Sequence, residues 1–254
     1  MLATQRRQQI LCYVWQHGEM LTNQAIELFG FSAPTVRRDF LKLVQSHPSI
    51  HRTHGGIRFN KQKADLEFEF DIKQQLQTTA KQEIAAKAVQ HVAPNDCIFL
   101  DSGTTCYELA KCLKEKEVTV ITTDLKIASL LAESSKVEVY IVGGKVRNGF
   151  FSIGDNTAVE FLSQFSAPKA FMSCDAISLN TGITNSSMFE VGVKKKVIQQ
   201  CQTVYLLADD SKFERTKPYA LATLSVITYL ITNRDLDDVI VQAYRARGIK
   251  MLHI

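Results

Sequence analysis

Apolar residues recur with helical spacing in three short stretches of the first quarter of the 254-residue chain. This spacing predicts helices over residues 4–17, over residues 22–29 and from Ser32 onward. The next stretch, SIHRTHGGIRF, has two short runs of strand-forming residues around a Gly-Gly turn, which is typical of a hairpin. The pattern therefore predicts a small unit of three helices and a hairpin within residues 1–59.

A different pattern follows. Residues 60–79 are polar and charged with scattered apolar side chains, and we interpret them as a linker that becomes helical. Beyond them, short apolar runs alternate with helical stretches; the runs are CIFLD, VTVIT, VEVYIVGG, KAFMSCD, TVYLLADD, VITYLIT and IKMLHI. This alternation predicts an α/β domain with a parallel sheet over residues 80–254.

The third predicted helix has two unlike faces when it is projected at about 100° per residue. The apolar face carries Val36, Phe40, Leu43 and Val44, and the polar stripe carries Thr35, Arg38 and Lys42. An apolar face of this kind docks the helix, so the polar stripe is left free to enter a groove. In a helix-turn-helix the second helix lies in the DNA major groove, where arginine can bond guanine edges or phosphates.

Other residues of this helix have separate expected roles. The Ser32 hydroxyl is expected to cap the helix by accepting from a free backbone N–H, and Pro34 is tolerated in the first turn. Arg37 projects to the flank, closer to a phosphate backbone than to base edges. Asp39 projects toward the packed side, where we expect it to pair with an arginine. An isolated Arg-Arg pair would be read as a solvated surface; the capped helix, the preceding short helix, the following hairpin and the local excess of positive charge together favour DNA.

The distribution of charge supports the DNA interpretation. Residues 1–59 contain seven basic and three acidic side chains and thereby hold the whole net charge of +4. A polyanion such as DNA would be attracted to this quarter of the chain.

The motifs RRQQIL, SAPTVRRDFLKL and RTHGG together resemble the winged helix-turn-helix of the DeoR family of bacterial transcriptional regulators. The resemblance covers residues 4–59, although VQSHPSIHR stands where relatives carry a glycine-containing turn before the wing. It implies that Thr35, Arg37 and Arg38 face DNA, with Arg52, His54 and Arg58 as secondary candidates in the wing. Ser32 at the helix start and Lys42 on the polar stripe complete the expected set of DNA contacts.

A candidate anion site lies where the first strand of the α/β domain ends. In CIFLDSGTTCYELAKCL a strand, a polar loop and a helix follow one another, an order that presents backbone N–H groups and hydroxyls to an anion. An ordinary capped helix would look the same. The loop is too short for a nucleotide-triphosphate loop and lacks its lysine.

Further polar residues follow the ends of other predicted strands. Because ligands of parallel sheets bind at the carboxyl ends of the strands, these loops can converge on one pocket. Cations with carboxylates and hydroxyls would suit a sugar phosphate, although each residue alone would be read as a solvated loop residue.

The motifs DSGTT, VGGKVR, D-x(6)-G-I-T, E-x-x-V-K and ADDSKF resemble the effector domain of the same family. That domain is similar to the ribose-5-phosphate isomerase fold and binds phosphorylated sugars or related metabolites. Relatives commonly read TN after the second strand, where this chain has TTD. The resemblance implies effector binding by Asp101, Ser102, Gly103, Thr104, Thr105, Lys145, Arg147, Asp175, Gly182, Glu190, Lys194 and Lys212.

The sequence thus predicts a regulator with three parts, namely a winged helix-turn-helix (1–59), a linker (60–79) and an effector-binding parallel-sheet α/β domain (80–254). We expect a repressor of a carbohydrate-utilisation operon that binds operator DNA as a homodimer or homotetramer and is controlled by a phosphorylated sugar. The alternative is a sugar-phosphate isomerase with Glu190 as general base, but the KGGG run of that enzyme family is replaced here by LNTGITNSS.

Some classes of site and location are not expected. The six cysteines form no C-x-x-C pair, so we expect reduced structural thiols and neither a metal nor another cofactor. No apolar run reaches the roughly 20 residues of a membrane helix, and the N-terminus does not resemble a signal peptide, so a cytoplasmic location is expected.

Overall fold

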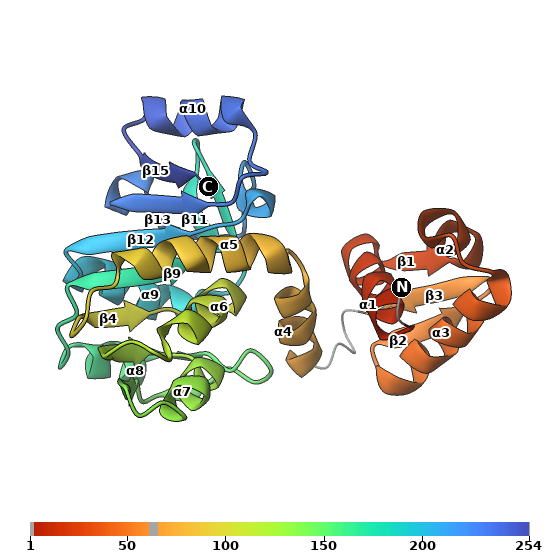
Figure 1. Cartoon of the computed structure of the whole chain (residues 1–254), viewed down its shortest axis with the longest axis horizontal. Helices are drawn as coiled ribbons and strands as arrows, with labels where there is room; N and C mark the ends of the chain where they lie inside the picture. Colours follow the sequence, from red (N-terminus) through yellow and green to blue (C-terminus); the bar gives the residue numbers. More distant parts are fainter. Residues whose placement is uncertain (1–2, 61–65, 254) are drawn as a thin grey trace. The chain divides into compact units, whose positions relative to one another are not determined.

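The computed structural model describes residues 3–60 and 66–253, and its internal contacts divide the chain into two units, Met1–Leu76 and Gln77–Ile254 (Figure 1). The division lies inside the stretch predicted as a linker, of which residues 61–65 lie outside the described residues. The helical part of that stretch is two helices. The first, α4 (Leu66–Gln75), belongs to the first unit and the second, α5 (Thr78–Ala88), to the second unit.

The first unit contains the predicted helices and hairpin. Its elements before α4 are α1 (Ala3–His17), β1 (Glu19–Leu21), α2 (Thr22–Phe29), α3 (Ala33–Ser46), β2 (Ile50–Thr53) and β3 (Gly56–Phe59). Strand β1 was not predicted, and it pairs antiparallel with β3 to give the sheet order β1-β3-β2. Gly30 ends α2 with a φ of 70°, a left-handed conformation that favours glycine.

The core of the first unit brings together side chains from all of these elements. The buried members are Ile10, Leu11, Val14, Met20, Ala25, Val36, Phe40, Leu43, Ile50, Ile57, Phe59 and Ile72. Three of the four residues assigned to the apolar face of α3 are therefore buried, and Val44 is half-buried against the same core. This packing fixes which side of α3 faces outward.

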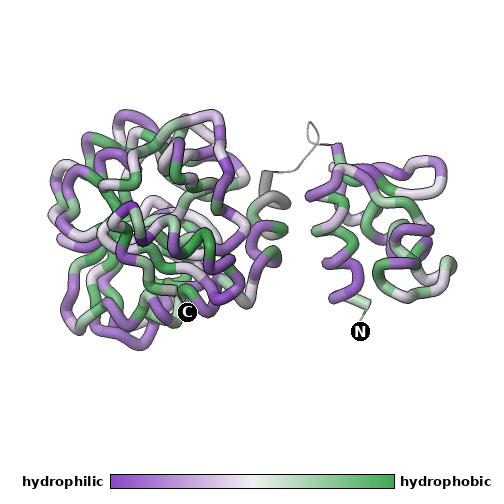
Figure 2. The backbone as a smooth tube through the Cα atoms, turned by 90° about the horizontal axis from the view of Figure 1, so that it is seen from above, coloured by the Kyte–Doolittle hydropathy of each residue, from purple (hydrophilic) through white to green (hydrophobic). Residues whose placement is uncertain are grey.

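The second unit is built on a seven-stranded parallel sheet of order β15-β14-β12-β9-β4-β5-β6. Its strands, in chain order, are β4 (Cys97–Leu100), β5 (Val118–Thr122), β6 (Val137–Ile141), β9 (Lys169–Ser173), β12 (Thr203–Leu207), β14 (Tyr229–Thr232) and β15 (Lys250–His253). Each strand matches one of the seven apolar runs, so the predicted parallel α/β fold is confirmed. Hydrophobic segments run through the interior of this unit in Figure 2.

Helices cover both faces of this sheet. The helices after α5 are α6 (Thr104–Leu113), α7 (Leu125–Ala132), α8 (Asn156–Leu162), α9 (Val191–Gln200) and α10 (Asp238–Ala246). Successive residues of a strand point to opposite faces. Accordingly Ile98 and Leu100 pack with α5, α6 and α7, whereas Phe99 packs in the cluster that holds α8, α9 and α10.

Two smaller strand pairings were not predicted. The antiparallel sheet β10-β11-β13 consists of β10 (Ala176–Ser178), β11 (Gly182–Asn185) and β13 (Tyr219–Ala222), and a hairpin joins β7 (Lys145–Val146) to β8 (Ile153–Gly154). Short 3-10 turns complete the unit, namely η2 (Val89–His91), η3 (Met188–Glu190), η4 (Asp210–Lys212) and η5 (Leu224–Val226). Among the described residues, no helix is long and apolar enough to cross a membrane.

Candidate functional site

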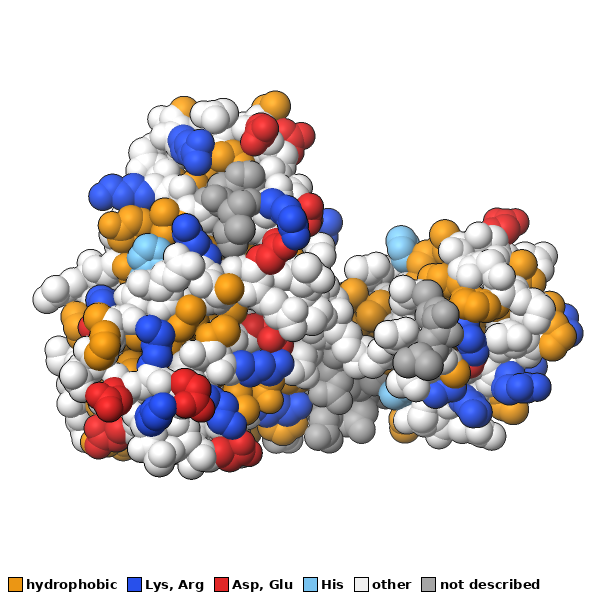
Figure 3. All heavy atoms as spheres, in the orientation of Figure 1, with side chains coloured by type: hydrophobic (Ala, Val, Ile, Leu, Met, Phe, Trp, Pro, Cys, Tyr) orange, Lys and Arg blue, Asp and Glu red, His pale blue; other side chains and the backbone are white. Residues whose placement is uncertain are grey.

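The outer face of α3 is the first candidate site. Arg37, Arg38 and Lys42 are exposed, and Thr35 is half-buried. Figure 3 shows several Lys and Arg side chains on the visible face of this unit. The burial of the opposite face leaves Arg38 and Lys42 free to meet a ligand, as the helical projection predicted.

The prediction that the Ser32 hydroxyl accepts from a backbone N–H of α3 is wrong. Ser32 occupies the N-cap position, but its side chain caps no backbone N–H and bonds instead to the Thr35 hydroxyl, with 3.0 Å between the two oxygens. The physical reason is that the residue three positions later offers a hydroxyl on the same side of the helix start. This bond holds the two hydroxyls together at the exposed end of α3.

Asp39 anchors α3 to α1. Its carboxylate is 2% exposed and forms ion pairs with Arg6 and, at 3.7 Å, with Arg7. The hydrogen bond from the Arg6 guanidinium to Asp39 raises the pKa of Arg6. The expected arginine pairing of Asp39 is confirmed, and within the described part of the chain its partners come from the first helix and not from α3.

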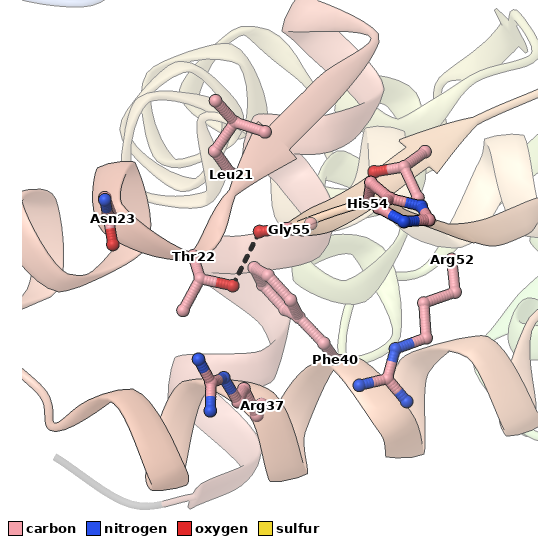
Figure 4. A pocket seen from close by; sticks show the side chains of 10 residues that line it. Leu21, Thr22, Asn23, Arg37, Phe40, Arg52, His54 and Gly55 are labelled. Carbon is pink, nitrogen blue, oxygen red and sulfur yellow. Dashed lines mark hydrogen bonds between the residues drawn. The ribbon is translucent and has the colours of Figure 1, made fainter.

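The hairpin places its three predicted residues differently. Arg58 on β3 pairs with Glu19 on β1, with 2.6 Å between Nη2 and the carboxylate oxygen. Arg52 on β2 and His54 in the turn lie instead beside a cavity of about 420 Å³ that Arg37 of α3 also lines (Figure 4). The structure thus brings Arg37, Arg52 and His54 together and directs Arg58 elsewhere.

The second candidate site lies at the carboxyl edge of the parallel sheet. Asp101, directly after β4, is 1% exposed, and Lys194 of α9 is 3% exposed. The Lys194 Nζ lies 2.6 Å from Asp101 Oδ2 and also donates to the Ser173 carbonyl oxygen at 3.0 Å. Burial lowers the pKa of Lys194, but the neighbouring carboxylates, Asp101 first and then Glu190 and Asp175, together outweigh burial and hold that pKa above its ordinary value.

The loop after β4 is less available to an anion than predicted. The Gly103 N–H, expected to be free, donates to Asp124 Oδ2 at 3.2 Å. Asp124 follows β5 and caps α7 with its other oxygen, which accepts from the backbone N–H groups of Lys126 and Ile127. Burial raises the pKa of Asp124 to about 6, although these backbone bonds oppose the shift. Ser102 and Thr105 are buried, and Thr104 is half-buried.

Glu190 is engaged with two side chains of another loop. Its Oε1 accepts from Ser152 Oγ at 2.6 Å and from Arg147 Nη1 at 3.2 Å. The Arg147 guanidinium also lies over the Phe150 ring, 3.5 Å from the ring centroid. The structure therefore brings Arg147 and Glu190 together, as an ion pair.

Among the remaining predicted effector-binding residues, Asp175 and Lys212 act on the same thiol, that of Cys174. Burial raises the pKa of the Cys174 thiol to about 12; the charges of Lys212 and Lys194 lower it, and those of Asp175 and Asp209 raise it. These four charges therefore act on the thiol that directly follows β9.

Two predicted residues are placed by the smaller strands. Gly182 is buried in β11 at a φ of 72°, where an added Cβ would lie 2.5 Å from the Ala222 carbonyl oxygen, so the strand pairing alone requires glycine. Lys145 is exposed on β7.

Several contributors were missed by the sequence reasoning. Ser173 holds Asp101 through its N–H and its hydroxyl, at 2.9 and 3.1 Å, and Ser152 holds Glu190. Thr22 and Asn23, at the start of α2, line the cavity beside the hairpin. Ser173 ends a predicted strand and could have been found by that signal; the other three carry no pattern of their own.

Comparison with known proteins decides the family. A model of the DeoR-like helix-turn-helix domain matches residues 6–63, and a model of the DeoR C terminal sensor domain matches residues 76–234. The chain belongs to the DeoR family. It is a transcriptional regulator with a helix-turn-helix domain followed by a sensor domain, as the resemblance of its motifs implied.

Relatives match along nearly the whole chain. A protein of Escherichia coli K12 named as an sgc region transcriptional regulator is 49% identical over 97% of this chain and 95% of its own. The L-fucose operon activator of Haemophilus influenzae is 31% identical over 92% and 93% of the two chains. Among solved structures, ribose 5 phosphate isomerase A from Neisseria gonorrhoeae aligns with a TM-score of 0.39 and 19% identity over 52% of each chain.

Proposed function

We propose that this DeoR-family regulator binds operator DNA through the outer face of α3 and represses a carbohydrate-utilisation operon under the control of a phosphorylated sugar. The observation that carries the DNA part is the exposed stripe of Arg38 and Lys42 on a helix whose other face is buried. Such a helix can enter the major groove without disturbing its own core.

The sensor part rests on the carboxyl edge of the parallel sheet. Loops that follow several of its strands carry polar residues, and among them Lys145 and Lys212 supply cations that suit a phosphate, as would Arg147 if a phosphate displaced Glu190 from it. Carboxylates and hydroxyls close to the end of β9 suit the hydroxyl groups of a sugar. We place the protein in the cytoplasm, where a regulator of this kind meets DNA. We expect a homodimer or homotetramer, because one winged unit contacts too few base pairs for a specific site.

The isomerase alternative is not favoured. A general base must reach the proton that it removes, but the Glu190 carboxylate is already bonded to Ser152 and Arg147. The relatives described above are named as regulators of transcription.

The DNA part is tested by selecting a binding sequence from random DNA with the full-length protein and measuring its affinity for Arg38→Ala. If Arg38 contacts a base, the variant should lose about 1–3 kcal/mol of binding free energy and tolerate other bases at one position. Lys195→Ala, which removes one exposed positive charge from α9, is the control. Equal affinity of Arg38→Ala and the control would refute the assignment.

The sensor part is tested by a thermal-shift screen of phosphorylated sugars against the purified protein. A ligand that binds only the folded state raises the melting temperature. A gel-shift measurement with the same compound then shows whether it releases the protein from DNA or strengthens binding.

A further inference from the structure

A notch lies beside the start of α2 and the hairpin turn, and α3 also lines it (Figure 4). Its volume of about 420 Å³ corresponds to roughly 14 water molecules at about 30 Å³ each, which is room for a hydrated anion. The residues that line it are Leu21, Thr22, Asn23, Arg37, Phe40, Arg52, Thr53, His54, Gly55 and Gly56.

The charge of the notch is entirely of one sign. Arg37 and Arg52 are permanently positive, and no Asp or Glu is among the residues that line the notch. Within the described part of the chain neither arginine has an ion-pair partner, whereas Arg58 is neutralised by Glu19. The two free guanidinium groups come from separate elements, α3 and β2.

The walls of the notch are held in place by the backbone. The Thr22 N–H and hydroxyl both donate to the Gly55 carbonyl oxygen, each at 2.7 Å. This pair of bonds ties the start of α2 to the hairpin turn, so the hairpin backbone that carries Arg52 is held close to α2. The first turn of α2 adds the partial positive charge of a helix N-terminus.

We propose that this notch binds one phosphate group of the DNA backbone and that Arg37 and Arg52 contact this phosphate from two sides. The inference rests on the proposed function, because it assumes that the first unit binds DNA. It gives the adjacent Arg37 and Arg38 different tasks. Arg38 does not line the notch and is left to read bases, whereas Arg37 fixes the register of the protein on the duplex.

The test replaces one operator phosphate at a time by an uncharged methylphosphonate and measures the affinity of the full-length protein. In each half-site, one position should weaken binding of the unsubstituted protein by about tenfold or more, because a hydrogen-bonded charge is lost. Arg37→Gln and Arg52→Gln should each weaken binding to the unmodified operator. Both variants should then respond less than twofold to the methylphosphonate at that same position.

A sequence-independent contact has a second signature. Each variant should lower the slope of log affinity against log salt by about one and weaken all operator sequences alike. Lys195→Gln is the control, because it removes an exposed positive charge from α9 of the second unit, and it should change affinity less than twofold.

The inference is overturned if Arg37→Gln or Arg52→Gln keeps the full response to the methylphosphonate, or if Arg37→Gln relaxes base preference at one position. Fluorescence of Trp15, the single tryptophan of the chain and part of α1, verifies that each variant folds. Failure of the unsubstituted protein to bind any DNA would instead refute the proposed function, so the two outcomes are distinguishable.

Discussion

The buried ion pair between Lys194 and Asp101 gives the sharpest test of the sensor domain. Its two side chains are 3% and 1% exposed, and the ammonium makes bonds of 2.6 Å to the carboxylate and 3.0 Å to the Ser173 carbonyl oxygen. Lys194→Met keeps the length of the side chain but leaves the carboxylate and that carbonyl oxygen without the ammonium.

The expected cost is about 3–5 kcal/mol of the free energy of unfolding, the usual effect of removing one partner of a buried pair. That is at least about a fifth of the roughly 5–15 kcal/mol by which a typical protein is stable. The neighbouring Lys195 is exposed, so Lys195→Met should stay within about 0.5 kcal/mol of the unsubstituted protein.

Chemical denaturation followed with two probes isolates this effect. Far-UV circular dichroism follows both units, whereas the fluorescence of Trp15 follows the first unit alone. Lys194→Met should shift the transition of the second unit and leave the Trp15 transition in place. A loss below about 1 kcal/mol would refute the reasoning, because it would mean that Lys194 is solvated and not a buried partner of Asp101.

Three further predictions concern single residues. Burial raises the pKa of Asp124 from 3.8 to about 6, so between these pH values the folded state holds a proton that the unfolded chain has lost. The free energy of unfolding should therefore fall by up to about 3 kcal/mol as pH rises from about 4 to 6. Denaturation of Asp124→Asn at several pH values should show a smaller fall. Asp39→Asn should destabilise the first unit by about 1–3 kcal/mol, measured by Trp15 fluorescence, because Arg6 loses its carboxylate partner. Gly182→Ala should lower the melting temperature of the second unit, since its Cβ would meet the backbone of β13.

Each of these has an outcome that contradicts it. The same pH slope in Asp124→Asn and in the unsubstituted protein would place the titration elsewhere. A first unit of unchanged stability in Asp39→Asn would mean that the contact with Arg6 contributes nothing. An unchanged melting temperature together with a lost ligand response in Gly182→Ala would make Gly182 a ligand residue, as the family resemblance implied.

The sequence predicted the elements that carry strong periodicity. Helix α3 was recognisable because its buried residues repeat along one face, and the seven parallel strands because each is a short apolar run between helices. Strand β1 was not predicted, because its three residues, Glu19 to Leu21, are too few to show an alternation of apolar and polar side chains. Their extended conformation is determined by the pairing with β3. The sheet β10-β11-β13 escaped for a similar reason, since Asn185 pairs with Tyr219, 34 positions later in the chain.

The candidate sites were predicted as sets of residues and not as contacts. Asp101 and Lys194 were both named, but 93 positions separate them, and no local pattern reports that they form a buried pair. Likewise Gly103 was read as a free donor because its partner, Asp124, lies in the next strand–helix loop. Side chains of the same type also differ, since among the described residues Arg52 has no ion-pair partner and lines the notch, whereas Arg58 on the adjacent strand is paired with Glu19.

The most direct test of the account measures operator affinity by fluorescence anisotropy as a function of the concentration of phosphorylated sugars. The account predicts that at least one phosphorylated sugar changes the dissociation constant of the full-length protein by about 5- to 150-fold, and that its unphosphorylated form does not. An operator affinity that stays constant with a sugar phosphate that binds the protein would contradict it.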